Sequence, residues 1–302
     1  MLVQTVESYL QVRRACGFKL KSQGSLLRSF ATYSDAMGKS HVCADTAIEW
    51  AGSARLATRR ARRLGEVIRF ARYARAEDSR HEVPPPVFGR EQRIRPIPYI
   101  LSVDEVGHLV LAASQLGRET LRRYTYSTLF ALLACTGLRV SEAIGLRYED
   151  ITSDGLLIRC SKFRKSRLVV LHDSARAGLE RYLERRRPYA PFDDHVFIST
   201  ARKPLIINDV EIAFRAAAAK IGLQRRPGTS RPTPHSLRHT FAVRALEACP
   251  DERDNITKHM LALSTYLGHA KIANTYWYLQ ATPELMRGIA ERCERFAMGD
   301  RP

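Results

Sequence analysis

Four separated segments carry side chains of the types that a phosphate group requires. They are Arg139 in TGLRVSEAIGL, the lysines of SKFRKSR at 162 and 165, His235 and Arg238 in TPHSLRHTF, and His269 with the phenols at 276 and 278 in YLGHAKIANTYWYL. A guanidinium grips two phosphate oxygens in a fork, and an imidazole exchanges protons near neutral pH. A hairpin lysine could reach into a DNA groove and deliver a proton. A phenol becomes a nucleophile where nearby cations favour its ionised form.

Each segment also has a structural interpretation that involves no chemistry. Arg139 can simply pair with Glu142, three residues later on the same helix. A turn lysine such as Lys162 is usually solvated. His235 can be a buried histidine beside its neighbouring arginine, and the aromatic residues at 276–278 can belong to a core. No single segment therefore decides between a site and ordinary packing.

The predicted elements place these side chains at helix ends and in a hairpin. An apolar helix over Tyr126–Cys135 stops at Gly137, a natural C-cap, so Arg139 opens the next helix, where free N–H groups favour an anion. The β-rich runs Leu156–Cys160 and Arg167–Leu171 predict a hairpin that carries the lysine at its tip.

A second helix end carries the imidazole and its partner cation. Thr233 and Pro234, as N-cap and first helical residue, begin the helix. His235 and Arg238 stand at i and i+3 and therefore project from one face. A cation beside an imidazole at a helix N-terminus suits a phosphate in a transition state.

Further elements complete the second half of the chain. Ser102 caps a helix with acids in its first turn, and Asn208 caps a helix that extends to Ile221. Val196–Ile198 is predicted to be a short strand, and a last helix covers Glu284–Phe296. The predicted fold class is mainly α with a small β-sheet, in which a helical N-terminal domain precedes an α+β domain.

Residues 1–82 are predicted to be all-helical. In Thr58–Glu77 the apolar residues at 64, 67, 68 and 71 form one stripe at helical spacing. Arginines surround this stripe, and the expected DNA contacts among them are Arg59, Arg62, Arg63 and Arg69. Such a run is usually a solvated face. Because this one is nearly all of one sign, contact with phosphates is favoured.

A proline-rich segment separates the two halves. Pro84-Pro85-Pro86 and Pro96-Ile97-Pro98 flank Arg93 and Arg95, and consecutive prolines hold the chain extended. We therefore expect a DNA-binding domain over 1–86, a basic linker over 87–100 that lies along DNA, and a further domain over 101–302.

Composition narrows the class of partner. The 302 residues suit two domains, and 49 Lys and Arg against 31 Asp and Glu give a net charge of +18. So basic a surface indicates a polyanion, with nucleic acid as the leading partner and a merely basic soluble or ribosome-associated protein as the alternative. No apolar run approaches the roughly 18 residues that span a bilayer, and the N-terminus has no signal-peptide pattern.

The six cysteines show no metal-binding or disulfide spacing. They are Cys16, Cys43, Cys135, Cys160, Cys249 and Cys293. We expect them to be small buried hydrophobic residues in a reducing cytoplasm, and we expect no metal ion and no cofactor.

Taken in order, the four segments resemble the catalytic domain of tyrosine recombinases, the phage integrase family. The series is an arginine, a lysine, His-x-x-Arg, Gly-His and a tyrosine nine residues later, and five such matches in order rarely arise by chance. The resemblance covers about Leu101–Met298, and the helical N-terminal part is similar to that family's core-binding (SAM-like) domain. The phrase TYWYLQATPELM is similar to recombinases of transposon-like mobile elements, including those encoded as trios of adjacent genes.

The resemblance implies cleavage and rejoining of DNA through a 3′-phosphotyrosyl bond, without ATP or metal. The implied roles are Tyr278 as nucleophile with Tyr276 as the alternative, Arg139 and Arg238 as phosphate clamp, His235 as proton acceptor, His269 as the second histidine, and Lys162 or Lys165 as general acid. The segment between Arg238 and His269 is longer than the family's usual spacing, which leaves the placement of His269 open.

The resemblance also implies a partner and an assembly. Double-stranded DNA would lie within a two-domain clamp, bound by a homo- or hetero-tetramer joined through the C-terminal helix, in the cytoplasm on the nucleoid. Alternatives are a type IB topoisomerase, a non-catalytic DNA-binding subunit of a recombination complex, and a basic structural or RNA-binding protein. The last of these would be indifferent to Tyr278→Phe.

Overall fold

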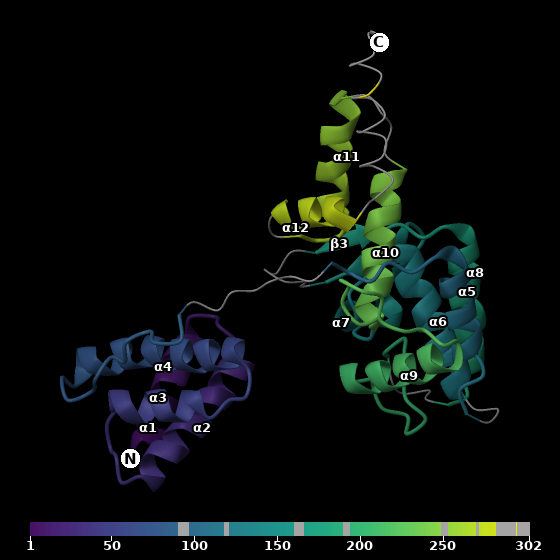
Figure 1. The fold of residues 1–302 in the computed structure, drawn as a ribbon. Coiled ribbons are helices and arrows are strands. Elements are labelled where there is room, and N and C mark those ends of the chain that lie inside the picture. Colours follow the sequence, from purple (N-terminus) through teal and green to yellow (C-terminus); the bar gives the residue numbers. More distant parts are fainter. Residues whose placement is uncertain are drawn as a thin grey trace. The chain divides into compact units, whose positions relative to one another are not determined.

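The chain forms two compact units, Met1–Arg95 and Pro96–Pro302. The computed structural model describes residues 1–89, 97–117, 121–159, 166–189, 194–248, 253–269, 272–281 and Glu294. Helices dominate both units and one small sheet lies in the second, so the predicted fold class is confirmed (Figure 1). Within the described residues, no helix has the length and apolar character to span a bilayer.

In its described residues, unit 1 is a bundle of four helices. They are α1 (Leu2–Ala15), α2 (Lys21–Ala36), α3 (Ala44–Gly52) and α4 (Ala57–Glu77) (Figure 1). The predicted stripe of α4 faces the core, where Leu64, Val67 and Ala71 are buried and Ile68 is partly buried. Rings from other helices, Phe30 and Trp50 among them, complete this core. Because the apolar stripe is buried, the arginines of α4 lie at its flanks and on its outer face.

A hydrogen-bonded group ties the start of α3 to the end of α4. Among the described residues, His41, Asp78 and His81 form the one group that has metal-ligand geometry. Arg80 Nη2 already donates to Asp78 Oδ2 at 2.8 Å, and His81 Nδ1 accepts the N–H of Val42 at 3.0 Å. The hydrogen bonds from Arg80 hold the pKa of Asp78 well below its usual range. With its ligand atoms engaged in this way, the group serves as a structural network.

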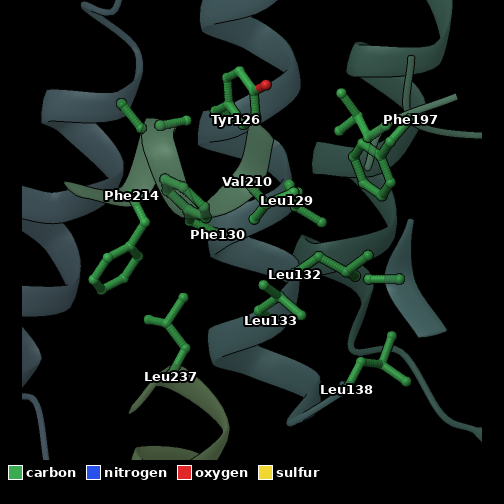
Figure 2. Close-up of a cluster of buried hydrophobic side chains, with 14 of the residues drawn as sticks. Tyr126, Leu129, Phe130, Leu132, Leu133, Leu138, Phe197, Val210, Phe214 and Leu237 are labelled. Atoms are coloured by element: carbon green, nitrogen blue, oxygen red, sulfur yellow. The ribbon is translucent and has the colours of Figure 1, made fainter. Parts of the chain in front are cut away.

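Unit 2 is built around α6. Its elements are α5 (Val103–Ala113), α6 (Leu121–Thr136), α7 (Val140–Ala143), η1 (Tyr148–Asp150), β1 (Ile151–Thr152), β2 (Gly155–Ile158), β3 (Arg167–Val169), α8 (Asp173–Arg186), α9 (Ile207–Lys220), α10 (Pro234–Glu247), α11 (Arg253–Tyr266), α12 (Ala273–Tyr276) and η2 (Trp277–Ala281). Figure 2 shows Phe130 and Leu133 of α6 beside Phe214 of α9 and Leu237 of α10, all fully buried. This core anchors the C-terminal end of α6 and the N-terminal end of α10 close together.

The predicted hairpin is confirmed, with one added strand. The sheet has the order β1-β2-β3, is antiparallel throughout, and pairs Leu156 with Val169. Gly155 opens β2 at φ +142°, where an added Cβ would lie 2.2 Å from the carbonyl oxygen of Val169. A side chain would therefore break this turn. The sheet positions β3 near the segment that follows α11.

Helix starts were predicted correctly where a capping box exists. Ser102 caps α5 and exchanges hydrogen bonds with Glu105, and Thr233 caps α10 with Pro234 as its first residue. The prediction for Asn208 was wrong, because α9 begins at Ile207 and Ile206 is its N-cap without a side-chain bond. Val210, near this earlier start, is fully buried, and no capping pattern in the sequence reports such burial.

Two further predictions were wrong. Val196–Ile198 is buried but forms no strand, because the segment and its neighbours pair only through the isolated bridges Arg147↔His195 and Ile198↔Pro204 and the bond from the Val196 N–H to the Leu146 carbonyl. These single bridges do not make a continuous ladder. The described cysteines are not buried: Cys16 and Cys135 are exposed and Cys43 is partly exposed, and all three are free thiols. The predicted helix Glu284–Phe296 falls almost wholly outside the described residues.

Candidate active site

The turn between α6 and α7 requires glycine. Gly137 adopts φ +62°, and a Cβ there would lie 2.4 Å from Cδ1 of Phe241 on α10. The close approach brings α10 against the turn. Arg139 follows as the N-cap of α7, as the sequence predicted.

One carboxylate organises two arginines at this turn. Glu142 Oε1 accepts from Arg139 Nη1 at 2.6 Å and from Arg167 Nη1 at 3.1 Å, while Oε2 accepts from Arg167 Nη2 at 2.8 Å. Arg139 Nη2 also donates to the carbonyl of Gly268 at 2.8 Å. The structural pairing of Arg139 with Glu142 is therefore present, and it fixes the guanidinium at the site.

Glu142 is ionised over the whole physiological range. Its side chain is 8% exposed, and burial alone would raise its pKa. The hydrogen bonds from Arg167 and from the backbone N–H of Arg139, with the charges of both arginines, outweigh burial and lower the pKa to about 2. The cluster thus holds a fixed negative charge between two cations, leaving a net positive site.

Arg238 is buried at the centre of the cluster. Only 1% of the residue is exposed, and its Nη1 and Nη2 each donate at 2.6 Å, to the carbonyls of Gly137 and Leu267. Burial first, and then repulsion from Arg139, lower its pKa to about 10, so the guanidinium stays charged at neutral pH. It therefore links α10, the α6–α7 turn and the end of α11.

Three imidazoles belong to the same cluster. His235 is exposed, and its ring lies 4.5 Å from that of His239, one turn later on α10. His269 Nδ1 is bonded to the hydroxyl of the buried Thr275 at 2.8 Å. Loss of water around the ring and the charges of Arg238 and Arg139 lower the pKa of His269 to about 3, and the same causes lower that of His235. Both rings are neutral at physiological pH.

Tyr278 lies inside the cluster and Tyr276 outside it. Tyr278, on η2, is 2% exposed, whereas Tyr276 is 49% exposed. The Tyr278 hydroxyl lies 3.1 Å from Nδ1 of His239, and its ring stacks on that of His269 with centroids 6.1 Å apart. Its ring packs among Ala242, Val243 and Leu267. The longer segment before His269 therefore leaves this histidine beside Tyr278.

The structure thus brings together five of the six predicted catalytic side chains, and adds others. The five are Arg139, His235, Arg238, His269 and Tyr278. Lys162 and Lys165 lie outside the described residues, as do Arg93 and Arg95. Sequence reasoning missed the contributions of His239, Arg167 and Thr275. A signal for His239 was available, because it stands at i+4 from His235 and so shares its face of α10.

The arginines of α4, in unit 1, have mixed settings. Arg59, Arg69, Arg72 and Arg75 are exposed. Arg63 donates to the carbonyl of Trp50 at 3.3 Å and to Ser53 Oγ at 3.0 Å, and it lies over the Trp50 ring. Arg62 donates to Ser22 Oγ at 3.2 Å. Part of the predicted DNA-contact set therefore also supports the bundle.

Comparison with known proteins gives a consistent result. Residues 100–284 match the model of the phage integrase family. The integrase/recombinase y4rB of Sinorhizobium fredii is 36% identical over 97% of this chain and 96% of its own length. The tyrosine recombinase XerD of Brucella suis is 30% identical over 94% and 89%. The Tn1549 transposon integrase, in complex with transposon right end DNA, shares the fold, with a TM-score of 0.67 at 18% identity over 96% of this chain and 98% of its own.

Proposed function

Because the chain belongs to the phage integrase family and is a tyrosine-type site-specific DNA recombinase, we propose that Tyr278 is the nucleophile with which it cuts and rejoins DNA. One observation carries this assignment. Tyr278 lies in a single cluster with Arg139, Arg238 and His269, which come from three other segments of unit 2. Relatives matched over nearly their full length are recombinases, so the topoisomerase and non-catalytic alternatives are not favoured.

The two sides of the cluster have separate uses. His235 is exposed and Arg139 keeps 24% of its side chain exposed, so a scissile phosphate meets these two first. Arg139 and the charge of the buried Arg238 stabilise the negative charge that grows on phosphorus in the transition state. His269, held by Thr275, lies against the Tyr278 ring and near the charges of Arg238 and Arg139. Glu142 positions Arg139 and Arg167, which donate to the carbonyls of Gly268 and Tyr266.

Cleavage forms a bond from Tyr278 Oη to phosphorus and breaks the bond from phosphorus to the 5′ oxygen. The leaving oxygen needs a proton, which we assign to Lys162, with Lys165 as the alternative on the same segment. The 3′-phosphotyrosyl bond conserves the energy of the broken link, so the 5′ hydroxyl can later attack and rejoin. Because Tyr278 is 2% exposed in the free chain, DNA binding must expose its hydroxyl.

We propose double-stranded DNA as the partner, with unit 1 and the linker arginines contacting its backbone. Strand exchange joins two duplexes that are each cut on two strands, so four nucleophilic tyrosines must act in one assembly, a homo- or hetero-tetramer. The mobile-element resemblance of TYWYLQATPELM supports integration, excision or transposition as the biological reaction, carried out in the cytoplasm on the nucleoid.

Covalent trapping tests this proposal. The full chain is incubated without divalent metal with duplexes from the ends of its mobile element, nicked near the cleavage site. A denaturing gel should show a protein–DNA adduct that Tyr278→Phe abolishes and Tyr276→Phe retains. An adduct that is lost only with Tyr276→Phe would identify Tyr276 as the nucleophile. Specific DNA binding without any adduct would favour the non-catalytic subunit.

A further inference from the structure

The Tyr278 hydroxyl and the imidazole of His239 form a hydrogen-bonded pair. Nδ1 of His239 lies 3.1 Å from the phenolic oxygen, within the range over which a proton passes directly between two groups. His239 follows Arg238 on α10, whereas Tyr278 belongs to η2, so only the fold brings the two together. The motif residues do not include His239.

Neighbouring rings hold the imidazole of His239 in place. Its centroid lies 4.5 Å from His235 at 81° and 5.3 Å from Trp277 at 68°, both edge-to-face arrangements. Its own ring is tilted 58° against Tyr278, at 5.4 Å. A ring fixed on three sides keeps Nδ1 directed at the phenol without the loss of side-chain freedom that an exposed histidine would suffer on binding.

The other two imidazoles have different positions. His235 is exposed, and no hydrogen bond joins its ring to another described residue. Nδ1 of His269 is engaged by Thr275 Oγ1. The motif-based assignment of the proton acceptor to His235 therefore places it one helical turn away from the group that contacts the phenol.

Building on the proposed role of Tyr278, we propose that His239 is the catalytic proton acceptor of this recombinase. With its own proton on Nε2, neutral His239 accepts the hydrogen bond of the phenol at Nδ1. As Oη bonds to phosphorus, the O–H proton moves to Nδ1, and the departing 5′ oxygen takes a proton from the general acid. In rejoining, the 5′ hydroxyl gives its proton back to the deprotonated general acid as its oxygen attacks phosphorus, and the imidazolium returns its proton to Oη as the bond from Oη to phosphorus breaks. His235 instead binds the phosphate.

A more acidic phenol at position 278 provides the test. The full chain is made with tyrosine or with a fluorinated tyrosine at position 278, each with histidine or with His239→Asn, and cleavage of the nicked duplex is timed at saturating DNA. With tyrosine, His239→Asn should slow cleavage by about 10²-fold or more. With the fluorinated phenol, which ionises without a base, the loss should shrink to less than about tenfold.

Two companion variants separate catalysis from structure. His235→Asn should slow cleavage by the same factor with tyrosine and with fluorinated tyrosine at position 278, because it removes a group that binds the phosphate and leaves the base in place. His259 lies on α11, and its Nε2 is bonded at 2.6 Å to the carbonyl of Ala245 on α10. His259→Asn should change neither cleavage rate by more than about twofold. His239→Gln repeats the test if His239→Asn fails to bind DNA.

The outcomes are distinct from those that test the nucleophile. An equal loss with both phenols, or no loss, overturns the role of His239 while an adduct abolished by Tyr278→Phe still stands. If the fluorinated phenol restored the cleavage rate of the His235→Asn chain, His235 would be the proton acceptor instead. An adduct that survives Tyr278→Phe overturns both proposals.

Discussion

Arginine side chains in the two units differ in exposure and in partners. On α4 of unit 1, Arg59, Arg72 and Arg75 are exposed to solvent. In unit 2, Arg238 is 1% exposed and bonded to two carbonyls, and the side chain of Arg167 is 10% exposed and bonded to a carboxylate. The same residue type is thus displayed at these three positions of α4 and fixed at these two positions of unit 2.

This difference separates binding from chemistry. An exposed guanidinium attracts DNA from a distance, and salt screens it, so each one contributes little and the contributions add. A buried guanidinium is oriented before the substrate arrives, and no solvent or side chain needs to reorganise when charge develops on phosphorus. The loss of one fixed arginine should therefore be severe, and that of one displayed arginine mild.

The largest effect is expected for Arg238→Lys. An ammonium cannot span the carbonyls of Gly137 and Leu267, so one carbonyl loses its partner and the charge moves. We expect cleavage at saturating DNA to fall by about 10²–10³-fold and the free energy of unfolding to fall by about 3 kcal/mol, measured by single-turnover kinetics and urea melts.

The matched control is Arg176→Lys. Arg176 also bridges two carbonyls, those of Thr152 and Ser153, at 3.0 and 2.7 Å. It lies on the hairpin side of α8, so its replacement should leave cleavage unchanged. Equal losses in the two variants would mean that Arg238 acts on the fold alone.

A smaller effect is expected for Glu142→Gln. The amide keeps the shape but has one acceptor oxygen and no charge, so Arg139 and Arg167 lose their common anchor. Cleavage should fall by roughly 10–100-fold with little change in DNA affinity. Glu149→Gln, which breaks an exposed ion pair with Arg159 at 3.1 Å, should change neither quantity. If Glu142→Gln lowered the affinity for DNA and left the cleavage rate unchanged, Glu142 would act in DNA binding.

Acid should weaken unit 2 through its neutral histidines, and most of all through His269, which has the lower pKa of the two. The pKa of His269 is about 3 in the folded chain and 6.5 when unperturbed, so the unfolded chain binds the extra proton as pH falls below 6.5. Stability is therefore full above that pH and declines between 6.5 and 3, by about 2 kcal/mol at pH 5.

The two tryptophans let this decline be followed in one unit. Trp50 lies in unit 1 and Trp277 in unit 2, so a Trp50→Phe chain reports unit 2 by fluorescence. Urea melts at pH 7 and pH 5 should differ more in this chain than in one that also carries His269→Asn. Identical differences in the two chains would show that His269 does not titrate as its surroundings dictate.

The sequence predicted the site better than the contacts within it. Local patterns located Gly137, the caps of α5 and α10 and the motif residues, because each depends on a few adjacent residues. The Tyr278–His239 bond joins residues 39 apart, and Arg167 reaches Glu142 over 25. Such pairs depend on how α6, α10 and the sheet pack, which no local spacing encodes. The missed start of α9 and the absent strand at 196–198 have the same cause, since burial decided both.

The mildest effects are expected on α4, where they distinguish displayed from packed arginines. Arg59→Gln and Arg72→Gln should each weaken DNA binding a few-fold and reduce the slope of log affinity against log salt by about 0.9, while cleavage at saturating DNA stays unchanged. Arg63→Gln removes the contacts to Trp50 and Ser53, so it should lower the stability of unit 1 more than it changes the salt slope. Filter binding at four salt concentrations measures the slopes. If Arg59→Gln slowed cleavage of bound DNA, exposed charge in unit 1 would also position the phosphate, and the division between the two units would fail.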